Sequence, residues 1–300
     1  MHDVVVLTDD RYVNPTKRSE YIENVLLEDQ LVLDALKNQG LNATKKSWSD
    51  PKFDWKQTKY VLFRTTWDYA ERFTEFSDWL IKVSTKTKLI NPYTLLVWNL
   101  DKHYLKDLKQ AGVNVVETYF MEFGDTRSLS QIHEKLGWTK TVLKPVVSAS
   151  AKDTFKLDST NISLHENRFK ELIQSESMML QPFQESVVER GELSLMVIGG
   201  EYTHAVLKVA KPGDFRVQDD FGGTVHEYQP TQEEIALALA AVKACDPEPL
   251  YARVDIVNDN EGKPAIIELE LVEPELWFRR NEEAAERLAE KLKMTYLFNQ

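Results

Sequence analysis

The sequence predicts a mixed α/β protein that begins with a parallel α/β lobe and continues as an α+β region. Two observations predict this order. Strand-like and helix-like runs alternate through about the first third of the chain, which is the rhythm of parallel β-α-β units. After the break at Asn91-Pro92, several strand-like runs follow one another across short turns, which is typical of antiparallel hairpins.

The N-terminal lobe is predicted from short apolar runs that flank amphipathic stretches. Apolar residues from Ile22 to Leu36 recur at near-helical spacing, and Gly40 stands where a helix commonly ends in the left-handed conformation. A second helix is expected at Phe73–Val83. The strands that these helices connect are expected at Val4–Leu7, Tyr60–Phe63 and Lys88–Ile90.

The remainder of the chain is predicted to be richer in strands. Gly199-Gly200 should join two strands in a tight hairpin, and Thr231 with Glu234 should cap a helix that runs to Ala244. A polar helix should end the chain, and residues 211–224 should form a mobile loop. The other expected elements are a helix at Trp98–Gln110 and strands at Val113–Met121, Lys140–Val147, Met178–Phe183, Glu192–Ile198, Tyr202–Val209, Tyr251–Val257 and Pro264–Leu271.

Composition and charge exclude several classes of protein. The formal net charge is -11 and no Lys/Arg-rich patch is present, which argues against nucleic-acid binding. Cys245 is the only cysteine, so the chain can form no internal disulfide and a reducing, cytoplasmic setting is expected. No apolar run is long enough to span a bilayer, and the first residues lack a signal-peptide pattern.

The predicted hairpin near the C-terminus carries the strongest chemical signal. Side chains alternate between the two faces of a strand, so Arg253 and Asp255 should share one face with Glu268 and Glu270. The opposite face is apolar throughout and should pack in the core. It consists of Ala252, Val254, Ile256, Ile267, Leu269 and Leu271.

Three acids on one sheet face indicate a cation site. Carboxylates that are crowded in a cleft repel one another and are costly to desolvate without a cation. Oxygen ligands of this kind suit Mg²⁺, which prefers one or two carboxylates together with phosphate oxygens. The alternative is a solvated polar face, but these strands carry no lysines that would pair with the acids.

Two lysines and one loop arginine are candidates for phosphate binding. Lys102 follows Asp101 near the start of a predicted helix, and Lys144 stands among apolar neighbours just before the small-residue run Ser148-Ala149-Ser150-Ala151. Arg216 lies between glycines in the predicted mobile loop, as in a lid that closes over phosphates. For each of these three residues, the alternative is an ordinary solvated side chain on the surface. The histidines have no metal-like spacing, and no Ser/His/Asp set or cysteine nucleophile stands out.

Taken in order, these motifs resemble the ATP-grasp superfamily over nearly the whole chain. The resemblance rests on Asp101-Lys102, Val142 to Pro145, Leu180 to Phe183, Gly191 to Ser194, Arg253 to Asp255, and Ile267 to Glu270 followed by Glu273-Pro274. It is greatest to the glutathione-synthetase-like and cycloserine-ligase-like branch, for which Arg64 to Tyr69, Asp214 to Gly223 and Glu268 to Pro274 are the informative stretches.

The resemblance implies three parts that grip ATP: a substrate lobe at residues 1–92, a small ATP-grasp subdomain at 93–183, and a subdomain with the metal site at 184–300. It implies substrate contacts from Arg64, Trp67 and Asp68, metal binding by Asp255, Glu268 and Glu270, and catalytic roles for Arg253, Arg216 and Lys144. The implied ATP-binding residues are Lys102, Lys144, Ser148, Ser150, Gln181, Phe183, Glu185, Glu192 and Lys208.

The implied activity is a ligase that uses ATP with one or two Mg²⁺ ions, or with Mn²⁺. It would convert a small-molecule carboxylate into an acyl phosphate and pass the acyl group to an amine or a thiol. Intramolecular ring closure, as in cycloserine formation, and a non-catalytic nucleotide-binding protein are the alternatives. Two departures stand out: Glu270 replaces the usual asparagine, and residues 148–151 lack the usual glycines. Homodimers are common among such proteins, so a homodimer is one state to test.

Overall fold

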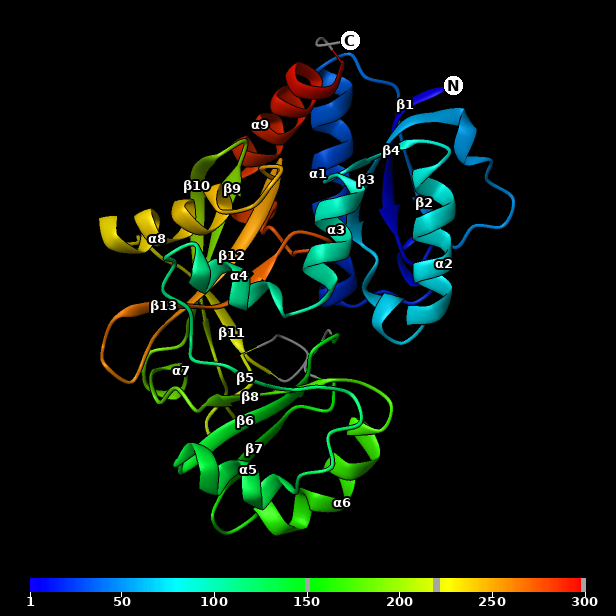
Figure 1. Ribbon diagram of the computed structural model, residues 1–300. Helices are drawn as coiled ribbons and strands as arrows, with labels where there is room; N and C mark the ends of the chain where they lie inside the picture. Colours follow the sequence, from blue (N-terminus) through cyan, green and yellow to red (C-terminus); the bar gives the residue numbers. More distant parts are fainter. Residues whose placement is uncertain (149–151, 218–221, 298–300) are drawn as a thin grey trace.

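The protein was described from a computed structural model, which covers residues 1–148, 152–217 and 222–297. Its strands form three separate sheets, each from a different stretch of the chain (Figure 1). The first sheet belongs to the N-terminal lobe. The second lies in the lower subdomain of Figure 1, and the third lies beside the N-terminal lobe.

The N-terminal lobe is the predicted parallel sheet with helices packed on it. The strand order is β2-β1-β3-β4, and all neighbouring strands run parallel. Each face of the sheet packs into its own apolar cluster, as expected where helices cover both sides. The elements are β1 (His2–Thr8), η1 (Asp10–Tyr12), α1 (Glu20–Asn38), β2 (Ala43–Ser47), η2 (Trp55–Gln57), β3 (Thr58–Thr65), η3 (Trp67–Ala70), α2 (Phe73–Ser84) and β4 (Lys88–Ile90).

The second sheet is antiparallel, with the strand order β5-β8-β6-β7. Two amphipathic helices, α5 and α6, bury their apolar sides in one cluster with strands of this sheet. The elements are α3 (Tyr93–Leu100), α4 (Tyr104–Gln110), β5 (Tyr119–Met121), α5 (Leu129–Leu136), β6 (Lys140–Pro145), β7 (Phe155–Asp158), α6 (Ile162–Ile173) and β8 (Met178–Pro182).

The third sheet is also antiparallel, with the strand order β11-β10-β9-β12-β13. The predicted capping box of Thr231 and Glu234 is present at the start of α8, whose alanines pack on the apolar face of this sheet. The elements are α7 (Ser186–Glu189), β9 (Glu192–Ile198), β10 (Glu201–Val209), β11 (Thr224–Glu227), α8 (Gln232–Lys243), β12 (Tyr251–Asn258), β13 (Pro264–Glu270), η5 (Phe278–Arg280), α9 (Glu282–Leu292) and the π-helix η6 (Lys293–Leu297).

The structure corrects several expected elements. The single helix predicted at Trp98–Gln110 is two helices, because the chain leaves the helical conformation at Asp101 and restarts at Tyr104. The strand predicted at Val113–Met121 is confined to β5. Short or strongly polar helices and strands have no clear apolar period and were not predicted; they are β2, α5, β7, α6, α7 and β11.

A segment after β13 ties the third sheet to the N-terminal lobe. We call residues 273–279 the strap. Its backbone is bonded by Arg64, Trp67 and Glu28 of the N-terminal lobe, and by His204 of β10. The helix α9 that follows lies beside α1 of the N-terminal lobe (Figure 1). The strap therefore joins parts of the chain that are more than two hundred residues apart in sequence.

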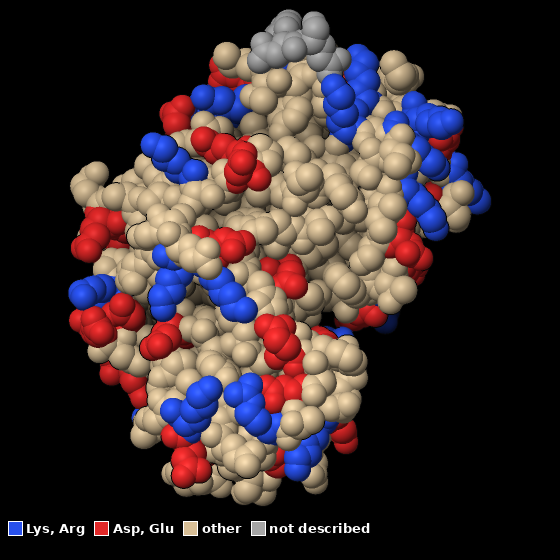
Figure 2. All heavy atoms as spheres, in the orientation of Figure 1, with Lys and Arg blue, Asp and Glu red and all other residues tan. Residues whose placement is uncertain are grey.

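Surface charge agrees with the composition. On the face drawn in Figure 2, lysines and arginines gather at the upper right, and they are mixed with aspartates and glutamates over the left and lower parts. None of the helices in the described ranges has the length and apolar character that crossing a membrane requires.

Candidate active site

A cavity of about 490 Å³ lies between the second and third sheets and reaches the N-terminal lobe at one end. Strands β6 and β8 line one side, and β9, β10, β12 and β13 line the other. The N-terminal lobe contributes η1 and η3, and the strap contributes Glu273, Glu275 and Trp277. All three parts of the chain therefore meet at one cavity.

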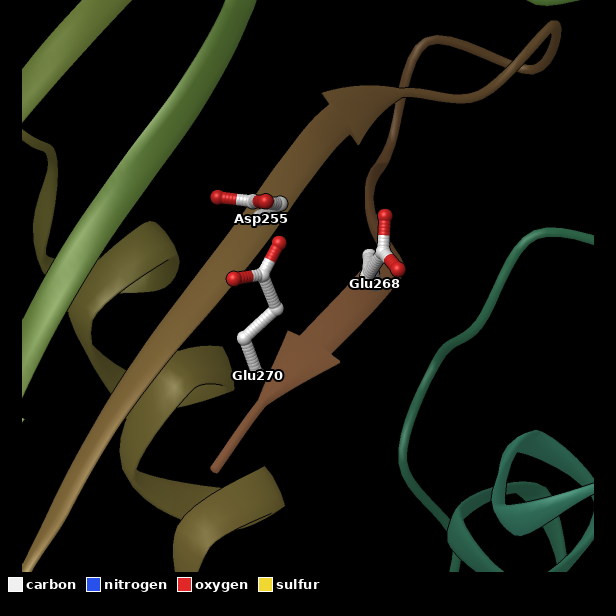
Figure 3. Close-up of side chains that lie close together, drawn as sticks. All are labelled: Asp255, Glu268 and Glu270. Atoms are coloured by element: carbon white, nitrogen blue, oxygen red, sulfur yellow. The ribbon is translucent and has the colours of Figure 1, made fainter. Parts of the chain in front are cut away.

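The acidic hairpin face predicted from the sequence lines this cavity. Arg253 lies opposite Glu270 and Asp255 lies opposite Glu268 in the register of β12 and β13. Figure 3 shows the three carboxylates pointing toward one another from these two strands, and they offer oxygen atoms that all lie within 4.8 Å of one another. A bulge beside Asp255 makes one correction: Ile267, expected in the core, lines the cavity, and Ile266 is fully buried instead.

Buried cations balance these carboxylates. The guanidinium of Arg253 is bonded to Asp255 at 2.8 Å and also to Glu270. The Lys102 ammonium lies 3.1 Å from Glu268. The Lys208 ammonium lies 2.5 Å from Glu192 and 3.4 Å from Asp255. The lysines that the hairpin lacks in sequence are thus supplied by other elements of the fold.

Burial and the neighbouring cations shift the pKa values of the three acids in different directions. Burial opposes the charge of Asp255, but Arg253 and Lys208 hold its pKa at about 2. Burial also opposes the charge of Glu268, yet Lys102 and Lys144 lower its pKa. Burial raises the pKa of Glu270 to about 7 despite the attraction of Arg253. One carboxyl group of the three is therefore poised to lose its proton when a cation binds.

Other candidate phosphate-binding residues also reach the cavity. Lys144 of β6 lines it, and burial lowers the pKa of its ammonium group. Ser148 lines the cavity too, and its carbonyl oxygen accepts a hydrogen bond from Lys102 at 2.8 Å. Arg216 lines the cavity and is paired with Asp214 at 2.8 Å. Ser150 and residues 218–221 of the predicted lid lie outside the described residues.

The predicted adenine hinge lies at the end of β8. Gln181 and Phe183 both line the cavity, and the ring of Phe215 meets that of Phe183 edge to face at 6.0 Å. Glu192 and Lys208 line the adjoining wall. Glu185 does not line the cavity, because its side chain is exposed and pairs with Lys140 at 2.7 Å.

Of the three residues predicted to contact the substrate, Trp67 is the one that lines the cavity. Arg64 is 1% exposed, donates to the Pro274 carbonyl at 3.0 Å and lies over the ring of Phe278. Asp68 accepts bonds from Trp48 and Arg72. In this structure Arg64 and Asp68 therefore support the scaffold around Trp67 and are not at the cavity wall.

The sequence interpretation did not assign a role to three prominent cavity residues. Glu273 and Tyr69 are both buried, and burial raises the pKa of Glu273 to about 8. Trp277 lies beneath two cations, with its ring centre 5.4 Å from Arg253 and 5.9 Å from Lys208. Tyr69 follows the Arg64 to Asp68 stretch, and Glu273 and Trp277 follow the acidic strand, so proximity to recognised motifs was the available signal.

The donor set fits a hard divalent cation. The three acidic side chains of the hairpin offer oxygen ligands in a confined cavity, which is the chemistry that Mg²⁺ prefers. The nearby lysines are point charges suited to phosphate oxygens. The cavity can therefore hold a metal-bound nucleotide at one end and leave the end at the N-terminal lobe for a second molecule.

Comparison with protein families gives two adjoining matches. Residues 4–91 match the N-terminal domain of the D-cycloserine synthetase DcsG. Residues 105–276 match the RimK-like ATP-grasp domain. A curated relative, the cycloserine biosynthesis protein DcsG of Streptomyces lavendulae, is 32% identical; the match covers 87% of this chain and 91% of the relative.

Solved structures agree with these matches. The crystal structure of the D-cycloserine synthetase DcsG superposes with a TM-score of 0.83 at 29% identity, over 97% of this chain and 98% of the other. The D-alanine–D-alanine ligase of Bacillus anthracis has a TM-score of 0.68 at 15% identity, over 98% and 97% of the two chains, and so shares the fold. The ATP-grasp architecture predicted from the sequence is confirmed.

Proposed function

The chain belongs to the RimK-like ATP-grasp family, and we propose that it is a Mg-ATP-dependent ligase that activates the carboxylate of a small amino-acid-like substrate. Membership makes it an ATP-dependent ligase that forms C–N bonds and uses a divalent metal, so the non-catalytic alternative is set aside. The observation that carries the proposal is one cavity in which Lys102, Lys144 and Lys208 face the carboxylates of β12 and β13.

In the proposed reaction, the side chains of this cavity act by positioning and charge. Lys144 and Lys102 neutralise the phosphates of ATP, so that a substrate carboxylate can attack the γ-phosphorus and release ADP. Arg253 stabilises the negative charge that develops on the acyl oxygen when an amine attacks the acyl phosphate and phosphate leaves. Arg216 closes the phosphate end. No covalent bond to the protein is required.

The metal would be held by Asp255, Glu268 and Glu270. When bound, it neutralises phosphate charge and polarises the transferred group. The three oxygens within 4.8 Å of one another support one or two Mg²⁺ ions, and Mn²⁺ has the same preference for oxygen ligands. The protein's own contribution is to hold these oxygens apart from bulk water, beside Arg253 and Lys208.

Intramolecular ring closure is a second candidate for the same site. It is favoured by the match of residues 4–91 to the N-terminal domain of a D-cycloserine synthetase, because this lobe closes the substrate end of the cavity. In that case the nucleophile and the activated carboxyl group would belong to one molecule. The chemistry at Arg253 and the lysines would be unchanged.

Release of ADP tests the proposal against a panel of amino acids, amines and amino-acid esters or amides in the presence of Mg²⁺. The double substitution Asp255→Asn with Glu268→Gln should lower substrate-dependent turnover by about a thousandfold or more, because it removes the ligand charge. Glu261→Gln is the matched control, since Glu261 is an exposed acid in the turn of the same hairpin. Unchanged turnover in the double variant would refute the metal assignment.

Product mass separates the two candidates. Ligation gives a product equal to the two substrates less one water, whereas ring closure gives the single substrate less one water. A gel-filtration and light-scattering measurement on the same sample reports whether the chain is a homodimer.

A further inference from the structure

We propose that Asn99, at the end of α3, and Tyr104, at the start of α4, are positioning residues for the metal centre. They bind the outer edge of β13 and thereby fix the spacing of Glu268 and Glu270. This inference rests on the proposed function, because it takes these two acids as metal ligands. It deepens that function by naming the groups that hold the acids in place, through the backbone of β13 rather than by contact with the metal.

The outer edge of β13 is paired by side chains. β13 is the last strand in the order of the third sheet, and the peptide groups of such an edge need partners when they are buried. The side chain of Asn99 donates to the Leu269 carbonyl at 2.8 Å and accepts from the Leu271 N–H at 2.7 Å. The Tyr104 hydroxyl accepts from the Leu269 N–H at 2.9 Å. These side chains therefore bond to β13 as a neighbouring strand would.

The three bonds fall on the backbone around the two acids. The Leu269 N–H belongs to the peptide unit that follows Glu268. The Leu269 carbonyl and the Leu271 N–H belong to the units on either side of Glu270. The orientation of its peptide units sets the direction in which a side chain leaves a strand. Fixing these three units therefore fixes how far apart the two carboxylates lie.

The inner edge of β13 is irregular at the same place. On that side Glu270 lies opposite Arg253 and Glu268 lies opposite Asp255, but the register shifts directly after Asp255. A bulge disrupts the ladder locally and increases the twist of the strand. Glu268 therefore lies where pairing with β12 is interrupted, so the contacts on the outer edge contribute more to its position.

Asn99 and Tyr104 are themselves firmly placed. Both side chains are buried. The ring of Tyr104 lies 5.3 Å from that of Trp98 and belongs to the apolar cluster that also contains Leu269. A packed side chain has few rotamers open to it, so it carries the position of its helix to the strand that it bonds.

The same part of the chain carries Lys102. α3 ends at Leu100 and α4 begins at Tyr104, so Lys102 lies between the two proposed residues. Its ammonium lies 3.1 Å from Glu268. Because hydrogen bonds on both sides of Lys102 hold this connection against β13, one set of contacts places both the cation and the acid that it pairs with.

The spacing of ligands matters most for a small cation. Mg²⁺ demands near-ideal octahedral geometry at about 2.1 Å, whereas Ca²⁺ accepts longer and more variable distances. Removing a residue that orients a metal ligand commonly lowers metal affinity by about tenfold to about a hundredfold. Loss of the edge contacts should therefore weaken Mg²⁺ binding more than Ca²⁺ binding. A residue that only stabilises the fold would not change the ratio of the two affinities.

Metal binding without turnover tests the proposal. Free Mn²⁺ is followed by EPR in the presence of the protein and a non-hydrolysable ATP analogue, and Mg²⁺ or Ca²⁺ is then added as a competitor. A sample that contains the analogue alone corrects for metal bound to free nucleotide. The measured quantity is the ratio of the Kd for Mg²⁺ to the Kd for Ca²⁺.

Two variants remove the edge contacts. Asn99→Leu keeps the size of the side chain and removes both of its bonds. It should raise the Kd for Mg²⁺ by about tenfold or more and the Kd for Ca²⁺ by about threefold or less. Tyr104→Phe loses one bond and should shift the ratio in the same direction by a smaller factor. Circular dichroism establishes that each variant is folded; where Asn99→Leu does not fold, Tyr104→Phe decides, because it retains the packing of its ring.

Asn91 provides a matched control. This buried side chain donates to the carbonyl oxygens of Tyr251 and Leu271, at 3.0 Å and 2.8 Å. It also accepts from the Leu250 N–H at 2.7 Å, so it holds the same hairpin beyond the acids. Asn91→Leu should lower the melting temperature at least as much as Asn99→Leu does, because it also leaves buried backbone groups without partners. It should leave the ratio of the two Kd values within about twofold of the wild-type ratio.

The proposal is overturned if the ratio in Asn99→Leu and Tyr104→Phe equals that of the wild type, or if Asn91→Leu shifts it by as much. Failure of the metal assignment has a different signature, because Asp255→Asn with Glu268→Gln would then bind Mn²⁺ as the wild-type protein does. Loss of Mn²⁺ binding in that double variant, together with an unchanged ratio in Asn99→Leu, keeps the metal site and removes the positioning role.

Discussion

The two ends of the cavity handle charge in opposite ways. At the end formed by β12 and β13, each carboxylate has a lysine or an arginine from another element beside it. At the end formed by the N-terminal lobe and the strap, Glu273 is also buried, but among the described residues no cation forms an ion pair with it. The first end holds its carboxylates beside fixed cations, whereas at the second end burial raises the pKa of Glu273 to about 8 and the carboxyl group keeps its proton.

This difference is the one expected between an end that binds the same ligands in every cycle and an end that selects one substrate. An end that must hold the same nucleotide and metal in every cycle benefits from fixed, paired charges, because little reorganisation is needed during the reaction. An end that must select one substrate benefits from a buried polar group whose partner is supplied by the correct ligand alone. A wrong ligand leaves that group buried and unpaired, which is costly. Substitutions at each end, and in the strap that joins them, test this difference.

The largest effect is expected from Arg253→Met. The substitution removes the cation shared by Asp255 and Glu270. It also removes the charge that we propose stabilises the acyl oxygen during attack. Turnover should fall by about a thousandfold. Removing one partner of a buried pair should also lower the free energy of unfolding of the metal-free protein by about 3 kcal/mol or more.

Measurement of ADP release and of urea unfolding checks both parts of this prediction. Arg280→Met serves as the control, because Arg280 is exposed and adjoins the strap. Addition of Mg²⁺ should recover part of the stability of Arg253→Met but none of the turnover. Recovery of both would mean that Arg253 acts through the metal ligands alone and has no separate role in catalysis.

The next effect is expected at the strap, from Arg64→Met. This buried side chain donates to the Pro274 carbonyl and lies over Phe278, so its loss leaves a buried carbonyl oxygen without its donor. The free energy of unfolding should fall by about 2 kcal/mol. Because the strap lines the end of the cavity at the N-terminal lobe, the KM for the carboxylate substrate should rise more than the KM for ATP. Equal changes in the two KM values would argue against this link.

A smaller effect is expected in the pH dependence of stability. Burial and the charge of Glu270 raise the pKa of Glu273 to about 8, above its ordinary value of 4.5. Below the ordinary value both the folded and the unfolded chain hold this proton. Above it the unfolded chain loses the proton first, so the stabilisation is lost as the pH rises toward 8. The metal-free protein should therefore unfold at lower temperature as the pH increases across this window.

Thermal unfolding in the presence of a chelator checks this dependence from about pH 5 to about pH 9. Glu270, whose pKa is raised to about 7, contributes with the same sign. Asp255, whose pKa is about 2, titrates below the window and does not contribute. Glu273→Gln should flatten the curve in part. Parallel curves for the variant and the wild type would show that Glu273 is ionised in the folded protein throughout.

The sequence was sufficient for the architecture and for the acidic hairpin face that lines the cavity. Strand alternation alone placed Arg253, Asp255, Glu268 and Glu270 on one face, and the register of β12 and β13 agrees. The prediction worked because the apolar face is uniform, so a shift by one residue would have buried four charges. It failed at Ile267, since a bulge adds one residue to a strand and leaves no mark in the apolar pattern.

The sequence did not predict how the N-terminal lobe forms its end of the cavity. Arg64 and Asp68 are polar residues next to Trp67, so they were interpreted as substrate contacts, but their partners are Pro274 in the strap, and Trp48 and Arg72 within the lobe. Such contacts join distant segments and follow from tertiary packing. A sequence does not distinguish a buried arginine that supports the fold from an arginine that binds a ligand. Likewise, nothing in the sequence shows that Glu273 is buried.

The smallest effect is expected from Trp277. This residue is 2% exposed, has a left-handed backbone with φ of 46°, and places its ring beneath Arg253 and Lys208. A non-glycine residue held in this conformation is maintained by its surroundings and is often found at functional sites.

If the ring face holds the two cations in place, Trp277→Leu should lower kcat by about tenfold, and Trp277→Phe, which keeps a ring, by about threefold or less. Leucine and phenylalanine are both apolar, so the comparison separates the ring's electrostatic contribution from simple packing. Steady-state kinetics with thermal unfolding as a check decides the matter: equal values of kcat for the two variants would limit Trp277 to packing, and leave the paired carboxylates to position both cations.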